Sequence, residues 1–213
     1  MEARVREEIV RASLAMAARG WVANHDGNVS ARVASNRLLC TPTATAKARV
    51  RAQDLVVTDA RGKQLSGRGR AFSEFGAHLA VYKARGDVGA VAHAHPPFAT
   101  ALGVSGRELL CFLPESVVSL GTRVPLVPLA APGAAAVTAM EPFFKDFDAV
   151  LVAGNGVFTW GDDVEQALLR LELVEHLAAI ASHAAAWGGP QPLPRDMVEK
   201  LLEARKKAFP RGG

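Results

Sequence analysis

Residues 87–97 read DVGAVAHAHPP, a run of small and β-branched apolar residues that ends in two histidines and two prolines. A short apolar run of this kind is typical of a buried strand, and Pro96 ends it because proline has no backbone N–H to donate. Side chains alternate along a strand, so His93 and His95 point to one side and Ala94 to the other. The run therefore predicts a buried strand that aims two imidazoles into the same space.

The rest of the chain mixes helical and strand patterns. Helices are predicted from apolar spacing, with caps at Ser73 and Asp162, over residues 2–19, 74–85, 134–144, 162–187 and about 195–207. Strands are predicted at residues 28–33, 37–43, 54–59, 123–130, 148–154 and 155–160. Several strands are neighbours joined by short turns, so we expect one α/β domain over residues 1–213 with a mixed or antiparallel sheet.

Composition limits the partners of this chain. Of its 213 residues 49% are hydrophobic, which is enough for a substantial core, and the formal net charge is +4. Aromatic residues are only 6% and no recognition motif occurs, so nucleic acid is not an expected partner. No apolar run of about 18 residues and no signal-peptide pattern occur, which predicts a soluble, cytoplasmic protein with no membrane partner. Cys40 and Cys111 are expected to be buried thiols, with a disulfide left open.

Glu74 is a second candidate site residue, and a functional role requires it to lie close to the histidine pair. It lies in the first turn of the predicted helix 74–85, and a short turn joins that helix to the strand that carries His93 and His95. Because the two elements run antiparallel, the start of the helix and the end of the strand should meet. Imidazole and carboxylate groups together can hold a divalent metal. The alternatives are a hydrogen-bonded histidine pair and a carboxylate that only stabilises the helix start.

These residues occur in an order that resembles the class II aldolase/adducin family, which includes fuculose-phosphate aldolases and ribulose-phosphate 4-epimerases. The chain reads GNVS at residues 27–30, TPT at 41–43, SE at 73–74, HAHPP at 93–97 and GNGVFTWG at 154–161. The resemblance covers nearly the whole chain. It implies an α/β/α sandwich around a mostly antiparallel mixed sheet and a homotetramer with sites between subunits.

The resemblance also implies a chemistry. Zinc would be bound by His93 and His95, with Glu74 as a further ligand that then accepts or donates a proton. The reaction would be retro-aldol cleavage of a small hydroxy-carbonyl or sugar-phosphate-like substrate through a metal-stabilised enediolate, with epimerases and dehydratases sharing this logic. Gly27, Asn28, Thr43 and Ser73 would line the phosphate loops.

The chain departs from the family pattern in two places. The third zinc ligand of the family is a histidine, whereas Asn155 occupies that place here, either as a weaker oxygen ligand that favours Mn or Mg or as a turn residue. His78, four residues after Glu74, is a better local replacement than His176 or His183. The phosphate loops read Thr43-Ala44 and Phe72-Ser73-Glu74 in place of Thr-Gly and Ser-Ser-Glu, which leaves phosphorylation of the substrate open.

Two functions therefore stay open. The first is a metal-dependent lyase of this family. The second is a non-catalytic, adducin-like protein that keeps the fold and has a degenerate metal site, as Asn155 suggests. The presence of Glu74, His93 and His95 favours the enzyme, because a non-catalytic protein (a scaffold) does not need these three side chains.

Overall fold

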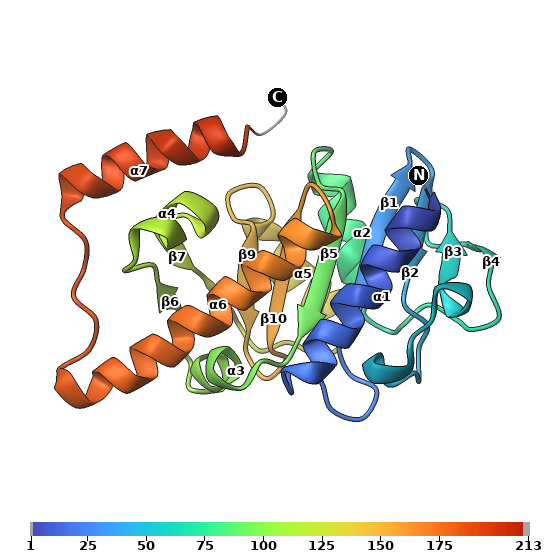
Figure 1. Cartoon of the computed structure of the whole chain (residues 1–213), viewed down its shortest axis with the longest axis horizontal. Coiled ribbons are helices and arrows are strands. Elements are labelled where there is room, and N and C mark those ends of the chain that lie inside the picture. Colours follow the sequence, from blue (N-terminus) through green and yellow to red (C-terminus); the bar gives the residue numbers. More distant parts are fainter. Residues whose placement is uncertain (1, 211–213) are drawn as a thin grey trace.

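A central sheet runs through the molecule in the computed structural model, which describes residues 2–210. Among these residues the sheet has eight strands in the order β4-β3-β2-β1-β5-β10-β9-β8, and every pairing is antiparallel except that of β8 with β9 (Figure 1). The strands of this sheet are β1 (Asn28–Ala34), β2 (Arg37–Cys40), β3 (Val56–Thr58), β4 (Gln64–Ser66), β5 (Ala90–Ala94), β8 (Leu126–Val127), β9 (Ala149–Val152) and β10 (Val157–Gly161). A separate pair consists of β6 (Leu109–Leu110) and β7 (Arg123–Val124).

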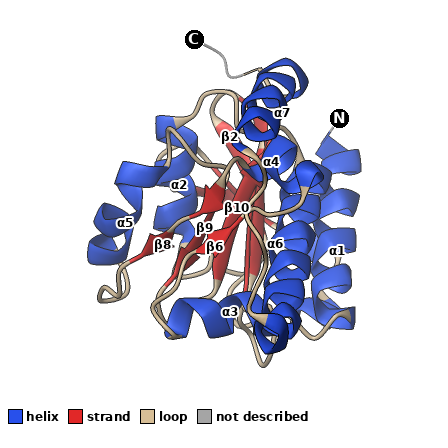
Figure 2. Ribbon diagram, turned by 90° about the vertical axis from the view of Figure 1, so that its left-hand side faces the viewer, coloured by secondary structure: helices blue, strands red, loops and turns tan. Residues whose placement is uncertain are grey.

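Helices cover both faces of the sheet, which gives the expected α/β/α sandwich (Figure 2). The α-helices are α1 (Glu2–Ala18), α2 (Phe75–Ala84), α3 (Pro97–Val104), α4 (Pro114–Leu120), α5 (Ala134–Met140), α6 (Val164–Ala184) and α7 (Arg195–Ala208). Short 3₁₀ turns are η1 (Lys47–Arg49), η2 (Ala52–Asp54), η3 (Glu141–Phe143) and η4 (Ala185–Trp187). Helices α1 and α6 lie on one face, and α2 and α5 lie on the other (Figure 2).

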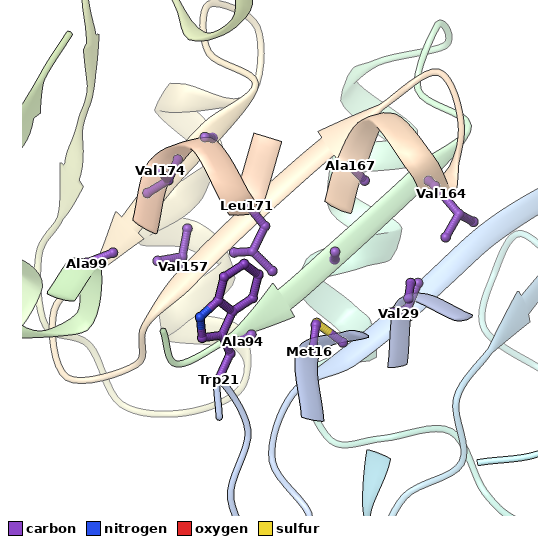
Figure 3. Packing of buried hydrophobic residues seen from close by; sticks show 14 of the residues in the cluster. Met16, Trp21, Val29, Ala94, Ala99, Val157, Val164, Ala167, Leu171 and Val174 are labelled. Atoms are coloured by element: carbon purple, nitrogen blue, oxygen red, sulfur yellow. The ribbon is translucent and has the colours of Figure 1, made fainter. Parts of the chain in front are cut away.

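Alternation along the central strand β5 divides the core into two halves. Ala90, Ala92 and Ala94 face the layer of α1 and α6, whereas Val91 packs in the layer of α2 and α5. The small alanines let Leu171 and Val174 of α6 pack close to the sheet (Figure 3). Because β5 is buried on both faces, all its residues except His93 are apolar. His93 is on the same side of the strand as Val91, which faces the α2 layer.

Two helices begin at cap residues other than the predicted ones. Ser73 is not the cap of α2: the cap position is Glu74, no side chain caps the helix, and the helix begins at Phe75. Asp162 is not the cap of α6 either, since Asp163 holds that position and accepts a hydrogen bond from the Gln166 amide at 2.8 Å. Each helix therefore begins one residue later than its predicted cap implies.

Other boundaries differ where polar residues interrupt a predicted strand. The predicted strand 54–59 is shorter, at Val56–Thr58, and Asp54 instead ends a 3₁₀ turn in which its carboxylate accepts the Arg51 amide hydrogen. The predicted strand 37–43 ends at Cys40, and Pro42 forms only an isolated bridge to Ala71. Strand β4 and helices α3 and α4 lie in segments for which no element was predicted.

A buried carboxylate ties the C-terminal helix to the sheet. Asp148 is 2% exposed and lies 3.1 Å from Arg85 and 3.4 Å from Arg170. Arg205 of α7 forms a third ion pair with it. Three cationic side chains around one carboxylate therefore fix α7 against the end of β9.

Two further expectations concern the cysteines and the membrane. Cys40 and Cys111 are both buried free thiols, so the disulfide that the sequence left open is not formed. No helix within residues 2–210 has the length and apolar character needed to cross a bilayer.

Candidate active site

His93 and His95 meet where strand β5 ends. His93 is fully buried, and its ring stacks on that of Phe158 from β10 with centroids 4.0 Å apart. His95 follows the last strand residue, and the two Nε2 atoms are 3.2 Å apart. Strand alternation alone predicted this common direction, and the register that places His93 opposite Phe158 explains the stacking.

The far side of each ring faces an acceptor. Nδ1 of His93 lies 2.9 Å from the carbonyl oxygen of Val157, and Nδ1 of His95 lies 3.2 Å from Oδ2 of Asp26 as an ion-pair contact. A carbonyl can only accept, so Nδ1 of His93 donates and neutral His93 keeps a lone pair on Nε2. That lone pair faces Nε2 of His95 at 3.2 Å and Oε2 of Glu74 at 3.4 Å, so the space between them suits a proton donor or a cation.

Glu74 adds a carboxylate to the same point. Its Oε2 atom lies 3.4 Å from Nε2 of His93 and accepts a hydrogen bond of 2.9 Å from the Asn28 amide. Its Oε1 atom accepts a hydrogen bond of 2.7 Å from the Asn155 amide. Burial acts to raise the pKa of Glu74, but His93 and the two amide donors outweigh it, so the pKa lies below its usual value. The site is therefore built to hold this carboxylate charged.

The sheet and two glycines bring these side chains together. Asn28 of β1 lies directly opposite His93 of β5, so its amide starts beside the imidazole. Gly156, at φ +72°, lets the Asn155 turn approach the strand, because a Cβ there would lie 2.5 Å from Cδ2 of His95. Gly27, at φ +69°, has no room for a Cβ either, which would lie 2.4 Å from a Val22 methyl group.

A cavity of about 1110 Å³ opens over this cluster. It is lined by all four residues that the sequence assigned to substrate binding, namely Gly27, Asn28, Thr43 and Ser73. Ala44, which follows Thr43, has a φ of 54°, a left-handed conformation that favours glycine. The family pattern has a glycine at this position. The predicted substrate loops therefore do surround one cavity.

Sequence reasoning missed Asp26 and Lys47. Asp26 orients His95 and also accepts the Ala23 amide hydrogen, so it was hidden in what reads as an ordinary turn. Lys47 is 3% exposed, and its ammonium group donates to the carbonyls of Thr45 at 2.7 Å and His25 at 3.2 Å. Both residues line the cavity. Nothing in the sequence separates Lys47 from the surface cations around it.

The remaining histidines do not replace the missing imidazole. His78 is fully buried, and its Nδ1 atom lies 2.8 Å from the Ser30 hydroxyl, among aromatic rings. Its Nε2 atom has no hydrogen-bond partner. His176 and His183 are on α6, on the opposite face of the sheet. His25 lines the cavity and is exposed.

The donor set fits a divalent cation in part. Two imidazole ligands on a tetrahedral zinc have their nitrogens about 3.3 Å apart, close to the 3.2 Å between His93 and His95 and to the 3.4 Å between His93 and Glu74. Over residues 2–210, however, no group of three or more His, Cys, Asp and Glu side chains is already arranged to hold a metal. Each Glu74 oxygen already accepts one amide hydrogen, and each keeps a second lone pair that a cation would use. Metal binding therefore does not require Glu74 to leave its amide partners.

Comparisons with known proteins agree with this geometry. Residues 7–182 match the model of the Class II Aldolase and Adducin N-terminal domain. The chain is 31% identical to methylthioribulose-1-phosphate dehydratase of Methylococcus capsulatus over 80% of this chain and 89% of that protein. It is 32% identical to 5-methylthioribulose-1-phosphate/5-deoxyribulose-1-phosphate aldolase of Rhodospirillum rubrum, over 84% of this chain and 81% of that one. The crystal structure of YgbL from Klebsiella pneumoniae superposes with a TM-score of 0.86 at 28% identity, over 94% of this chain and 99% of YgbL. This chain belongs to the class II aldolase and adducin family.

Proposed function

We propose that this chain is a divalent-metal-dependent lyase that cleaves a small hydroxy-carbonyl substrate by a retro-aldol reaction. The observation that supports this most is the convergence of His93, His95 and Glu74, of which His95 and Glu74 line one large cavity. The relatives are dehydratases, aldolases and decarboxylases by name, so dehydration at the same site is the nearest alternative. Epimerisation is a further alternative, because it also proceeds through an enediolate.

The cation would be held by His93, His95 and Glu74, with Asn155 as a weaker oxygen ligand. Zinc is the first choice because two imidazoles suit it, and Mn or Mg are the alternatives because amide and carboxylate oxygens suit them. When bound, the cation acts as a Lewis acid that stabilises the negative charge developing on the substrate oxygens.

Glu74 is the group placed to move the proton. In cleavage, the hydroxyl on the β-carbon loses its proton and becomes the carbonyl of an aldehyde product. The bond between the α- and β-carbons breaks, and its electron pair stays on the other fragment as an enediolate. Glu74 accepts that proton and returns it to the enediolate carbon, so one carboxylate balances both steps. Its lowered pKa keeps it ionised at neutral pH. Asn28 and Asn155 fix the orientation of the carboxylate through their amide hydrogens.

An anionic group of the substrate is proposed to bind to polar side chains that line the cavity. The amide of Asn28 and the hydroxyl groups of Thr43 and Ser73 are available to it. Lys47 adds a cation that is buried rather than solvated. Two of the three ammonium hydrogens of Lys47 are used by backbone carbonyls, which leaves one for a ligand. A phosphate or a carboxylate satisfies this chemistry.

Elemental analysis of protein purified without added metal tests the proposal. Near-stoichiometric zinc or manganese is expected, with loss of the metal in His93→Ala and retention in His183→Ala, which removes an exposed histidine of α6. A panel of phosphorylated and unphosphorylated hydroxy-carbonyl substrates then identifies the reaction. Metal-bound wild-type protein that consumes no member of the panel would refute the lyase assignment.

A non-catalytic, adducin-like role is the second candidate. It is favoured by Asn155 in the place of the third imidazole and by the amide-bound state of Glu74. This alternative expects metal-free protein whose thermal stability does not change in chelator. The lyase expects a bound metal whose removal lowers stability, because a ligand that binds only the folded state stabilises it.

Assembly as a homotetramer, which the family resemblance implies, belongs to the same proposal. Trp187 is 84% exposed, so its indole ring offers a large apolar surface that a neighbouring subunit would cover. Light scattering on the eluted protein should give four times the 22.5 kDa mass of the chain. A monomer at micromolar concentration would contradict it.

A further inference from the structure

His95 lies just beyond the strand pairing that fixes His93. The pairing of β5 with β1 ends at His93, and its pairing with β10 ends at Ala94. The backbone amide of His95 donates instead to the carbonyl of Trp21, at 2.9 Å, in the segment between α1 and β1. The position of the His95 ring relative to His93 therefore depends on what holds the segment that follows β5.

The two prolines after His95 limit how that segment can be held. Pro96 and Pro97 have no backbone N–H, so the first amide hydrogens that the chain offers after His95 belong to Phe98 and Ala99. Both residues lie in the first turn of α3, where an amide hydrogen has no carbonyl partner within the helix. Ala99 is fully buried, so its amide would lower the stability of the fold unless an acceptor reached it.

Glu175 of α6 supplies the acceptor for both amides. Its Oε1 atom accepts the Phe98 amide hydrogen at 3.1 Å, and its Oε2 atom accepts that of Ala99 at 2.8 Å. Glu175 is only 8% exposed, and its neighbour Val174 packs in the same buried cluster as Ala99 (Figure 3). A carboxylate is also favoured at the start of a helix, where the peptide dipoles leave partial positive charge. One buried side chain therefore joins the start of α3 to the middle of α6.

We infer that Glu175 is a positioning residue that keeps the His95 imidazole beside that of His93 by fixing the start of α3. Glu175 is not among the described residues that line the cavity, so it acts through the backbone of residues 95–99. The fixed φ angles of Pro96 and Pro97 leave little freedom to absorb a shift of α3 before it reaches His95. The consequence for metal binding rests on the function proposed above.

Zinc affinity of two Glu175 variants is the first test. Glu175→Ala removes both acceptors, and Glu175→Gln keeps the side-chain shape and one acceptor oxygen, so it serves if the alanine variant does not fold. The Kd is measured by competition with a chromophoric chelator. We expect Glu175→Ala to raise the Kd about tenfold and Glu175→Gln to raise it less, since groups that orient a ligand usually contribute at least this much to metal affinity.

Glu172→Gln is the matched control. Glu172 is a carboxylate on the same helix, but it pairs with Arg19 of the segment after α1 and not with the start of α3. The control should therefore keep the wild-type Kd for zinc.

Hydrogen exchange of the metal-free protein gives a readout that a merely structural role would not move. Exchange of the His95 amide hydrogen, followed by NMR, should accelerate about tenfold in Glu175→Ala relative to the amide hydrogens of β5, because local opening of the segment after β5 becomes easier. If Glu175 only stabilised the fold as a whole, the amides of His95 and of β5 would accelerate together.

The outcomes separate this inference from the proposed function. Selective acceleration at His95 together with weaker zinc binding supports the inference. If the wild type binds zinc and the Glu175 variants bind it equally tightly, the inference is overturned and the lyase stands. Weaker binding with uniform acceleration of exchange also overturns it. Selective acceleration at His95 in a protein whose wild type binds no metal supports the positioning role and refutes the lyase, whereas unchanged exchange in such a protein refutes both.

Discussion

Replacing Asp26 by asparagine tests whether the chain compensates for its missing third imidazole. Asp26 lies 3.2 Å from Nδ1 of His95, on the side of the ring away from His93. A carboxylate in this position fixes the ring orientation and makes the other ring nitrogen a stronger electron donor, and losing such a partner usually weakens metal binding about 10–100-fold. Asparagine has the same size and keeps an acceptor oxygen, so mainly the charge is lost.

The expected effect is near the lower limit of that range. Asp26 and His95 have side chains that are 30% and 32% exposed, so water screens part of the carboxylate charge. We expect Asp26→Asn to weaken zinc binding about tenfold, which corresponds to about 1.4 kcal/mol. The Kd is measured by competition with a chromophoric chelator. Asp54→Asn is the matched control, because Asp54 also accepts a backbone amide in a turn and is 28% exposed.

The measurement refutes the reasoning if Asp26→Asn binds zinc as tightly as the wild type while His93→Ala does not bind it. Asp26 would then serve only the turn, through its bond to the Ala23 amide. Equal weakening in the Asp54→Asn control would show a general effect of charge instead of an effect on His95.

Four further predictions follow from individual contacts. Asn155→His should tighten zinc binding by about tenfold or more in the same competition assay, because the residue at this position already reaches Glu74. Asp148→Asn should lower the free energy of unfolding by about 3–5 kcal/mol in urea titrations, since it leaves buried arginines without their shared carboxylate. Burial holds the pKa of His78 well below 6.5, so below that pH the unfolded chain binds a proton that the folded chain does not. The free energy of unfolding therefore falls as the pH is lowered from about 6.5 to about 5. His78→Phe should reduce the slope of that fall by up to about 1.4 kcal/mol per pH unit. Ala44→Gly should raise the free energy of unfolding by about 0.5–1 kcal/mol, measured thermally, because it relieves a left-handed backbone conformation at φ 54°.

The convergence of Glu74 with His93 could be predicted because it depends on local rules. Strand alternation sets the direction of the histidines, and a short turn between antiparallel elements returns the chain to the start of the helix. Both rules act within about twenty residues of sequence, so no long-range contact had to be guessed. The same locality explains why the apolar runs around β5, β9 and β10 were assigned as strands.

The contribution of Lys47 could not be predicted, because it depends on contacts that are distant in sequence. Its ammonium group is buried by a bond to the His25 carbonyl, 22 residues away. Before the fold is known, Lys47 resembles the exposed Arg49 and Arg51 that follow it. The error at Ser73 has the opposite origin: the local cap pattern is present, but Glu74 takes the cap position because its carboxylate is held by two distant asparagines.

The two proposed functions can be weighed on the geometry of the imidazoles. A non-catalytic protein needs only the fold. The hydrogen bonds from the Asn28 and Asn155 amides to Glu74 would stabilise that fold by joining three segments of the chain. The same need does not explain why Val157 takes the Nδ1 proton of His93 and leaves its Nε2 as an acceptor that faces the Glu74 carboxylate. That arrangement puts two acceptors, Nε2 of His93 and Oε2 of Glu74, 3.4 Å apart, which costs stability unless a cation or a proton lies between them. Burial lowers the pKa of His93 and so disfavours the proton. A divalent cation is the occupant that best accounts for this pair of acceptors, and this favours the enzyme over the scaffold even though Asn155 occupies the place of the third imidazole.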